Sequence, residues 1–592
     1  MALDPKSGSL VQDALTIFNH AKEKRRPLVG KWVTNYHVTH NRTWTTARPP
    51  GHPRTEIPEI YPILASIVAW ETDMTPQFKV APNVPPFSPY IDQYSDLARD
   101  LEWILNTNYE TLDYASEVAQ VLWDGEMYGI GYGKTTWEPS SSGGLGDAYL
   151  RRVDPFNMYL DPDAKSWKDL NYIFEVKQLS KQEISRRFPK ANLEELSFKL
   201  QDTPNAPTQL DKSGSTQGHR PNPGSLPNAS PPATSTATNV TRFGGKTGSQ
   251  PRVFDDEVTL VELWYRTQAP SGLKPSTEDA TPETPNIHPY KDEWRCLVFS
   301  GEQVLLNKSA DEIFGHGQHP YARYCPLEEG ELYGYSLVEQ LAPMQIAINR
   351  LFAAVEHNAW LTGNPILVHR AGDTVNITNR PGERMETQDP NQDIRWLVPP
   401  PISMQHISVI DKMIEEMERV SGISAIMRGQ QPQGRPSEGL VNSVQDSAFV
   451  RVRQRLRNFE RFLRESGFML ATIITEFYDQ SRVMSRVGSD DESPMTMALQ
   501  NQHFYTVNDD DGTKDPMRFN LSVRAGAFGA IGREARAAMY ERYFAMGAID
   551  AGSLLRLSQV PNWKDIEEKV NAEKAAAGTE GQPPTQRAAA RR

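Results

Sequence analysis

Residues 332–365 read LYGYSLVEQLAPMQIAINRLFAAVEHNAWLTGNP, and the rest of the chain can be read outward from this stretch. Ser336 is a preferred helix N-cap residue and stands directly before a run at helical spacing. That run consists of Leu341, Gln345, Ile348, Asn349, Phe352 and Val355. Gly363, Asn364 and Pro365 end it, because glycine or asparagine directly after a helical run, with proline following, marks a helix C-terminus. The pattern predicts a helix from Ser336 to Trp360.

The sequence pattern changes from helical to strand-like directly after this helix. From Ile366 to Pro401, short apolar runs alternate with turn residues, as is typical of small strands. The runs and turns are Ile366-Leu367-Val368, Val375-Asn376-Ile377, Arg380-Pro381-Gly382-Glu383 and Trp396-Leu397-Val398. A second helix is predicted from about Met404 to Ser421. The two predicted helices therefore flank a compact, β-rich segment.

Residues 427–436 are rich in Gly, Pro, Gln and Arg and predict an exposed loop. Ser437 then caps a further helix, since no proline follows until Pro494. Apolar residues keep helical spacing from Leu440 to Phe477. At 1.5 Å per residue this helix is about 60 Å long.

The first half of the chain mixes helical and strand patterns. Residues 1–48 and 94–128 are helical in pattern, the latter without a proline to break it, and 131–138 and 148–153 alternate like strands. Residues 201–252 are dominated by Pro, Ser, Thr, Gly and Asn and predict a disordered insertion. Strand alternation resumes at 257–265 and 294–299. The fold class predicted for the whole chain is α+β, with several modules.

The composition narrows the function classes. A net charge of -12 and a pI near 5.6 argue against a protein that coats nucleic acid by neutralising phosphates. A mostly acidic surface still suits a conduit past which DNA slides, because it repels phosphate. The two cysteines, Cys296 and Cys325, offer no disulfide framework or Cys-rich zinc site and suit a reducing cytoplasm. No signal peptide is expected, and the apolar run 57–70 contains Glu59 and Pro62 and is too short to span a bilayer.

Three motifs resemble catalytic or metal sites but depart from them. Residues 129–135, GIGYGKT, lack the first glycine of a phosphate-binding loop, since Tyr128 stands there, and they lead into a strand. Residues 244–247 likewise have Val240 at that glycine position. The acidic run 508–512 has Val507 and Arg518 where a calcium loop needs ligands. With no HExxH pair or Gly-x-Ser-x-Gly elbow either, we expect no catalytic residue, no metal and no cofactor.

Several local sequences together resemble the portal proteins of tailed double-stranded DNA bacteriophages. They begin with VDPFNMYLDPDA at 153–164 and LYGYSL at 332–337, which leads into Gln345 and Asn349. They continue with Gly363-Asn364-Pro365, Ser421-Gly422-Ile423 and the stretch 445–455 that opens the long helix. Their order holds over roughly residues 90–570. Each piece alone is a weak motif, and the specificity lies in the order.

The resemblance implies a division into wing, stem, clip, tunnel loop and crown. The implied modules are a mixed α/β wing region at 1–335, a first stem helix at 336–362, a clip at 363–403, a second stem helix at 404–422, a tunnel loop at 423–437, a long wing helix with its following segment at 438–518, a helical crown at 519–571 and a disordered tail at 572–592.

The resemblance also implies a role without catalysis. The chain would be one subunit of a ring, a dodecamer by family, at one capsid vertex of the virion, assembled in the host cytoplasm. Double-stranded DNA would pass through it without sequence specificity. The terminase, tail or adaptor proteins, and capsid and scaffolding proteins would be its partners, with no membrane. The alternatives are another head-tail adaptor protein, or an enzyme of DNA packaging.

The expected site residues fall in three groups. Tunnel-loop residues that touch DNA in the channel are Arg428, Gln430, Gln431, Gln433 and Arg435. Stem residues that could face the channel or neighbouring subunits are Asp411, Glu415 and Glu418. Clip residues that dock partners are Arg370, Arg380, Glu383 and Arg384.

The long helix carries a series of arginines on two faces. Arg453, Arg457, Arg461 and Arg464 follow one face, and Arg451 and Arg455 lie on another. We favour a salt-bridged subunit interface over DNA contact for this series.

Overall fold

The fold is taken from a computed structural model of the 592-residue chain. The structure describes residues 9–44, 52–72, 75–83, 91–193, 196, 257–270, 290–363, 366–369, 394–397, 404–423, 438–478, 482–485, 496–499, 505–507, 514–516, 519–524, 540–546 and 554. The expected disordered insertion at 201–252 lies outside these residues, as do the tail at 572–592 and nearly all of the expected crown.

The chain forms two compact units, each assembled from separate stretches. The first contains residues 1–64, 120–134 and 151–451, and the second contains 65–119, 135–150 and 452–592. The modules predicted from the sequence are consecutive in the chain, whereas these units are not.

The first unit contains a five-stranded antiparallel sheet in the order β4-β5-β6-β7-β8. Its strands are β4 (Met158–Leu160), β5 (Tyr172–Ser180), β6 (Glu257–Pro270), β7 (Tyr290–Ser300) and β8 (Gln303–Ser309). Spatial neighbours are also sequence neighbours, so the sheet is a meander. The short helices α5 (Lys181–Arg187) and α7 (Ala310–Ile313) follow β5 and β8.

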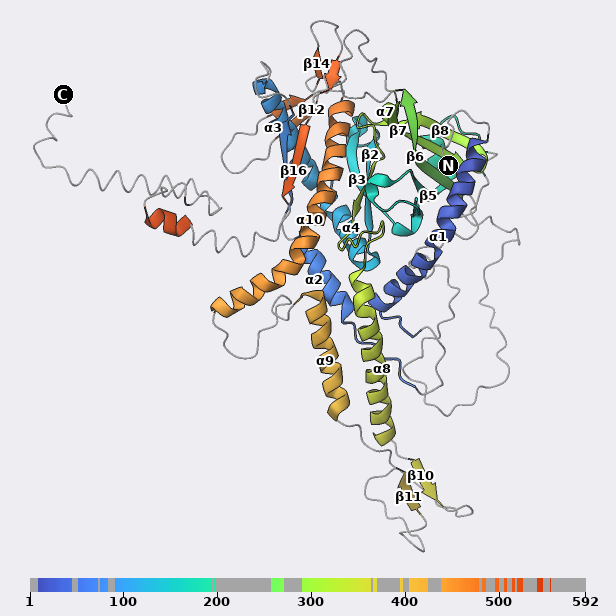
Figure 1. The fold of residues 1–592 in the computed structure, drawn as a ribbon, viewed down its shortest axis with the longest axis vertical. Helices are drawn as coiled ribbons and strands as arrows, with labels where there is room; N and C mark the ends of the chain where they lie inside the picture. Colours follow the sequence, from blue (N-terminus) through green and yellow to red (C-terminus); the bar gives the residue numbers. More distant parts are fainter. Residues whose placement is uncertain are drawn as a thin grey trace, which may run out of the picture. The chain divides into compact units, whose positions relative to one another are not determined.

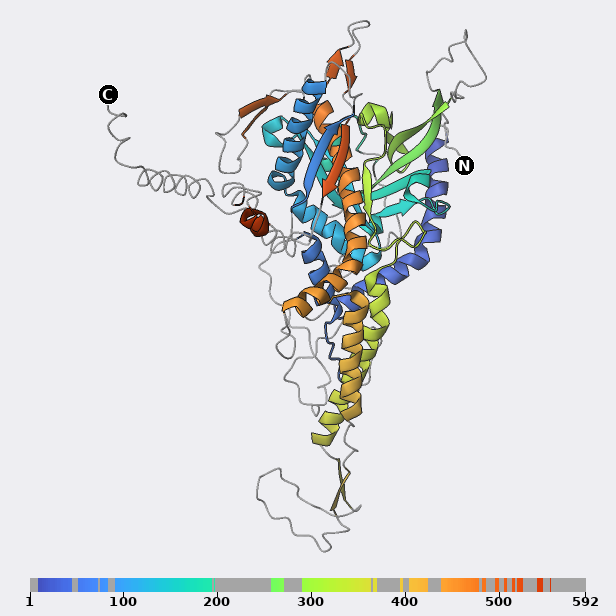
Figure 2. The ribbon, with the colours of Figure 1, turned by 60° about the vertical axis from the view of Figure 1, so that its left-hand side comes forward.

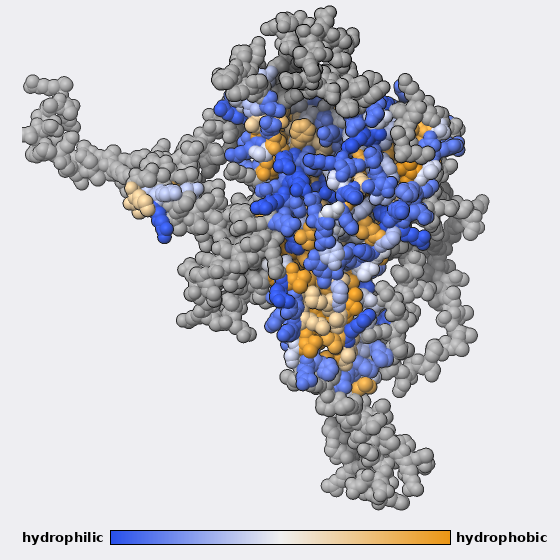
Figure 3. Space-filling view, in the orientation of Figure 1, coloured by the Kyte–Doolittle hydropathy of each residue, from blue (hydrophilic) through white to orange (hydrophobic). Residues whose placement is uncertain are grey.

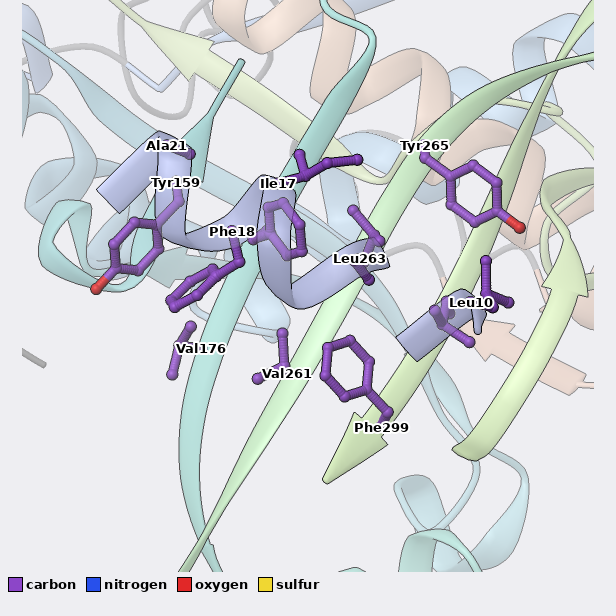
Figure 4. Close-up of a cluster of buried hydrophobic side chains, with 13 residues drawn as sticks. Leu10, Ile17, Phe18, Ala21, Tyr159, Val176, Val261, Leu263, Tyr265 and Phe299 are labelled. Carbon is purple, nitrogen blue, oxygen red and sulfur yellow. The ribbon is translucent and has the colours of Figure 1, made fainter. Parts of the chain in front are cut away.

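Helix α1 (Leu10–Thr39) packs against one face of this sheet (Figure 4). Leu10, Ala14, Ile17, Phe18 and Ala21 recur at helical spacing and are all buried. They meet the alternate, inward-facing residues of the strands, which are Tyr159, Phe174, Val176, Val261, Leu263, Tyr265, Leu297 and Phe299. The helical period of 3.6 and the strand period of two therefore meet in one apolar layer.

The motif at 153–164 is explained by local hydrogen bonds. Asp154 accepts a 2.9 Å hydrogen bond from the Phe156 backbone N–H and so caps a single 3-10 turn. Asp161 accepts from the side chain of Asn171 at 2.8 Å. Buried Arg25 of α1 donates to the carbonyl oxygens of Phe156, at 2.7 Å, and of Met158. The motif thus joins α1 to the start of the sheet.

A three-stranded sheet has the order β3-β2-β9, with β2 (Gly131–Glu138), β3 (Asp147–Val153) and β9 (Tyr321–Tyr324). The strand expected at 131–138 is confirmed at both ends, and the one at 148–153 begins one residue earlier. Lys134 of β2 is buried and bonded to Glu175 of β5 and Glu262 of β6, at 2.7 and 2.6 Å. The Lys134 ammonium group is thus paired with two carboxylates of the five-stranded sheet and does not act as the lysine of a phosphate-binding loop.

Helices α8 (Leu337–Gly363) and α9 (Met404–Ser421) lie side by side in Figures 1 and 2. Both agree with the predicted helices to within a few residues. Between them in the chain, β10 (Ile366–His369) pairs with β11 (Ile394–Leu397) in antiparallel register. The expectation of strands between two helices is confirmed for these two runs, and the run at 375–377 lies outside the described residues.

The second unit contains a two-stranded antiparallel sheet, β1 (Gln77–Pro82) with β16 (Phe519–Arg524). Helix α3 (Ile91–Thr111) contacts β1, and the last part of α10 (Glu438–Phe477) packs on both strands. At Gly467 of α10 a side chain would collide with Phe78 and Leu521, so glycine allows the close approach. Two hairpins complete the described strands: β12 (Arg482–Ser485) with β13 (Thr496–Leu499), and β14 (Tyr505–Val507) with β15 (Lys514–Pro516).

Three features differ from the sequence predictions. The basic helical region at 1–48 contains one helix that ends at Thr39. The region at 94–128 is two helices, α3 and α4 (Tyr114–Tyr128), because Asp113 between them adopts a positive φ of 54° that interrupts the helix. Residues 519–524, expected at the start of the helical crown, form strand β16.

Candidate functional site

Helix α8 begins at a serine that bonds in two directions. The Ser336 hydroxyl accepts a 3.0 Å hydrogen bond from the Val338 N–H, which confirms the predicted cap. The same hydroxyl lies 2.9 and 2.7 Å from the carbonyl oxygens of Glu126 and Met127. Burial raises the pKa of Glu339 in the first turn, and Lys31, 3.8 Å away, opposes that shift. The start of α8 is therefore fixed to α4 and α1.

Two amide side chains on α8 hold the segment that leads into α2 (Ile60–Thr72). Gln345 accepts from the Glu59 N–H at 3.2 Å and donates to the Ile57 carbonyl at 2.5 Å. Asn349 accepts from the Ile57 N–H at 3.1 Å and donates to the Thr43 hydroxyl at 3.2 Å. Both amides are buried, and Gln345 also donates to Asn349 at 3.0 Å. These two residues of the sequence motif act as a structural clamp.

Helix α9 carries the three acidic stem candidates on one stripe. Asp411, Glu415 and Glu418 are spaced i, i+4, i+7 and lie beside the buried stripe of Ile410 and Met417. Asp411 and Glu415 are exposed, and Glu418 is half-buried. Asp411 and Glu415 make no ion pair with another residue that the structure describes.

The other flank of α9 is apolar and exposed. Val409 and Val420 are 45% and 36% exposed, and Trp360 near the end of α8 is 52% exposed. Figure 3 shows hydrophobic side chains gathered over the α8 and α9 pair. An exposed apolar patch of this kind on a long helix pair marks a contact surface.

The clip residues Arg370, Arg380, Glu383 and Arg384 and the tunnel-loop residues Arg428, Gln430, Gln431, Gln433 and Arg435 lie outside the described residues. Their roles stay predictions. Of the three groups of candidates, only the acidic stem residues are among the described residues, and all three lie on α9.

The arginines of α10 divide between two environments as their spacing predicted. Arg455 is buried, whereas Arg457, Arg461 and Arg464 are exposed on another face. The side chains of Arg451 and Arg453 lie outside the described residues.

One buried charged cluster was missed by the sequence reasoning. Lys134 and Lys177 both pair with Glu175 and Glu262, and the Tyr321 hydroxyl donates to Glu175 at 2.7 Å. Burial raises the pKa of both carboxyls, but the two lysines outweigh it and hold each pKa below its usual range. The sequence did contain a signal for this cluster, because Glu175 and Glu262 are charged residues within otherwise largely apolar strands.

Metal-binding clusters and membrane-spanning helices are both absent from the part of the chain that the structure describes. Within it, no group of three or more His, Cys, Asp or Glu side chains is placed to hold a metal ion. Among its helices, none combines the length and the apolar character that a membrane crossing needs.

Comparison with known proteins gives the family. A search of the curated proteins found no match. The model of a family described as phage P22-like portal protein matches residues 40–592. That match includes both helices α8 and α9, the strands between them and all of α10. Because it extends over nearly the whole sequence, the chain belongs to the phage P22-like portal protein family.

Proposed function

We propose that this phage portal protein is one subunit of a ring that passes double-stranded DNA through a capsid vertex, with α8 and α9 as its stem. The observation that carries the proposal is the pair of long helices flanking β10 and β11, with an acidic stripe and an apolar flank on α9. Portal proteins belong to the capsid vertex of the virion. The subunit number of twelve and the channel face are our finer proposals.

The acidic stripe supports the assignment of a channel face. DNA that moves must not be held, and carboxylates repel phosphate and so lower the barrier to sliding. Asp411 and Glu415 would repeat in every subunit and line the channel with negative charge. Glu418 would continue the same stripe.

The apolar flank supports the assignment of a subunit contact. Val409 and Val420 are exposed in the single chain, and closed rings bury such faces in heterologous contacts between neighbours. In this arrangement each stem helix pair covers the flank of the next one.

The clip and the tunnel loop complete the proposal. Residues 363–403 would dock the terminase during packaging and tail or adaptor proteins afterwards, through Arg370, Arg380, Glu383 and Arg384. Replacing these four with alanine should weaken attachment while rings still form. Residues 423–437 would touch DNA transiently, and deletion of residues 429–434 should leave rings intact and impair DNA packaging or retention. We propose no catalytic residue and no cofactor.

Negative-stain microscopy of the purified protein, with the mass of the particle in solution, tests the ring. We expect rings with a central hole and a mass near twelve subunits. The variant Val409→Asn/Val420→Asn should form far fewer rings at unchanged helicity, whereas Asp411→Asn on the acidic stripe should form them normally. A fully helical protein that stays monomeric at high concentration would contradict the proposal.

A further inference from the structure

A groove in the second unit lies between α10 and β16, which run side by side in Figures 1 and 2. Its volume is about 320 Å³. From α10 it is lined by Arg457, Glu460, Arg461 and Arg464, and from β16 by Leu521, Ser522 and Val523. None of these residues belongs to the stem, clip or tunnel loop.

The helix side of the groove is basic. Arg457, Arg461 and Arg464 are exposed and spaced i, i+4, i+7, so they stand in one row. Arg457 and Arg464 make no ion pair with any other residue that the structure describes. With one glutamate among three arginines, the groove favours an anionic ligand, although the whole chain carries a net charge of -12.

The strand side of the groove is an open sheet edge, and the opposite edge of the same sheet shows the contrast. On β1, the N–H groups of Phe78 and Val80 donate to Asn106 and Glu102 of α3, at 3.0 and 3.1 Å. Asn106 also donates to the Phe78 carbonyl at 3.1 Å. Side chains of α3 therefore cap the outer edge of β1.

This capping fixes which backbone groups of β16 point into the groove. In an antiparallel pair, residues directly opposite each other share the same orientation. Phe78 lies opposite Val523, and Val80 lies opposite Leu521. The N–H and C=O groups of Leu521 and Val523 thus point away from β1, and they have no hydrogen-bond partner among the described residues. Such an edge is a template for a further strand.

We propose that this groove binds an acidic peptide segment in extended conformation, which adds as a strand to β16 and places its carboxylates on the arginine row. Alternate side chains of a strand are about 6.7 Å apart. Residues four apart on a helix are separated by about 6 Å along the axis. Acidic residues on one face of such a strand therefore lie along the row, where Arg457 and Arg464 can each hold a carboxylate through two hydrogen bonds.

The strand edge favours a peptide over a DNA backbone. Leu521 and Val523 each present an acceptor carbonyl as well as a donor N–H. A phosphodiester accepts hydrogen bonds but cannot donate to a carbonyl, whereas a peptide strand does both. The inference goes beyond the role in DNA passage and does not depend on it.

Fluorescence anisotropy of the full-length protein tests the proposal, with a labelled peptide of about seven residues that alternates valine and glutamate. We expect Arg457→Gln/Arg464→Gln to weaken binding about tenfold or more, since two charge-assisted contacts are lost. Arg99→Gln is the matched control, because Arg99 is an exposed arginine of the same unit that pairs with Asp96 instead. It should bind like the wild type.

Two altered peptides separate charge from strand pairing. Glutamine in place of glutamate should weaken binding by a similar factor, and N-methylation of alternate residues should do so with the charge unchanged. Amide exchange at Leu521 and Val523 should slow when the glutamate peptide is bound. Equal affinity of the double arginine variant and the wild type would overturn the proposal. So would a short DNA duplex that binds with the same arginine dependence while N-methylation of the peptide changes nothing.

Discussion

Lys134 is held between the carboxylates of two neighbouring strands, with only 9% of its side chain exposed. Its replacement by methionine leaves Glu175 and Glu262 with Lys177 as their remaining lysine. Removing one partner of a buried ion pair costs about 3–5 kcal/mol, because a charge stays buried without compensation. We therefore expect Lys134→Met to lower the free energy of unfolding by about that amount, measured by urea denaturation.

The control is Lys308→Met on β8, where the lysine is exposed and forms no ion pair with another described residue. We expect it to change the free energy of unfolding by less than about 0.5 kcal/mol. Adding Glu262→Gln to Lys134→Met removes one uncompensated charge and should restore part of the loss. Equal effects of Lys134→Met and Lys308→Met would show that the cluster is not needed for stability.

We expect two histidines, His316 and His319, to make the stability of the protein depend on pH. Burial lowers the pKa of His319 to about 3 and that of His316 to about 4. In the unfolded chain both would titrate near 6.5. As the pH falls from 6.5 towards 4, the unfolded state takes up protons that the folded state does not, so stability is lost. We expect a loss of about 1 kcal/mol per histidine between pH 6.5 and 5, since both residues are half-buried.

The measurement is the melting temperature across this pH range. His316→Gln/His319→Gln should flatten the curve below pH 6.5, and His20→Gln, at an exposed position, should not. Parallel curves for the wild type and the double variant would refute the assignment.

The segment that leads into α2 depends on the two clamping amides of α8, Gln345 and Asn349. With Gln345→Ala/Asn349→Ala, the Ile57 N–H loses its acceptor, whereas the Glu59 N–H keeps the Ile57 carbonyl at 3.1 Å. Unsatisfied groups of this kind cost about 1–3 kcal/mol. We expect faster amide exchange and faster proteolysis within residues 52–59, while the helix itself stays intact. Gln340→Ala on the same helix is the control, and equal exchange rates in the two variants would contradict the clamp.

Periodicity and helix-ending residues were sufficient to predict α8 and α9. Ser336 and Gly363 bound α8, and apolar residues at helical spacing define α9. The break between α3 and α4 was not predicted, because Asp113 breaks the helix by its backbone conformation and no proline marks the place. Strand β16 was assigned to the crown, since a short strand with a partner 437 or more positions earlier leaves no local signal.

Sequence spacing predicted those features of the candidate site that lie within one helix. The acidic stripe of Asp411, Glu415 and Glu418 follows from helical spacing, and the structure places all three on α9. The buried cluster around Lys134 depends on which strands become neighbours, and the free edge of β16 depends on which side of β1 is capped. Neither the pairing of the strands nor the capping of β1 can be predicted from the spacing of residues in the sequence.

At the scale of the whole molecule, the function depends on repetition of one surface around a ring. A channel wall built from α9 would carry Asp411 and Glu415 once per subunit, so a change in one chain is multiplied by the number of chains. Charge reversal, Asp411→Lys/Glu415→Lys, would turn a repelling wall into an attracting one. Lysines close to DNA bind phosphate by releasing counterions, and such binding weakens steeply with salt.

We therefore expect rings of the Asp411→Lys/Glu415→Lys variant to form normally, because both positions lie on the acidic stripe and not on the apolar flank. Packaging or ejection of DNA should slow several-fold at low salt and recover partly as the ionic strength rises, since salt screens exposed charges. The measurement is the amount of packaged DNA, or its rate of release, across a salt series. Glu329→Lys/Glu331→Lys is the matched control, because it makes the same change in net charge at exposed positions away from α9. If both variants slow DNA to the same extent, net charge alone is responsible. If neither does, the acidic stripe does not face the channel.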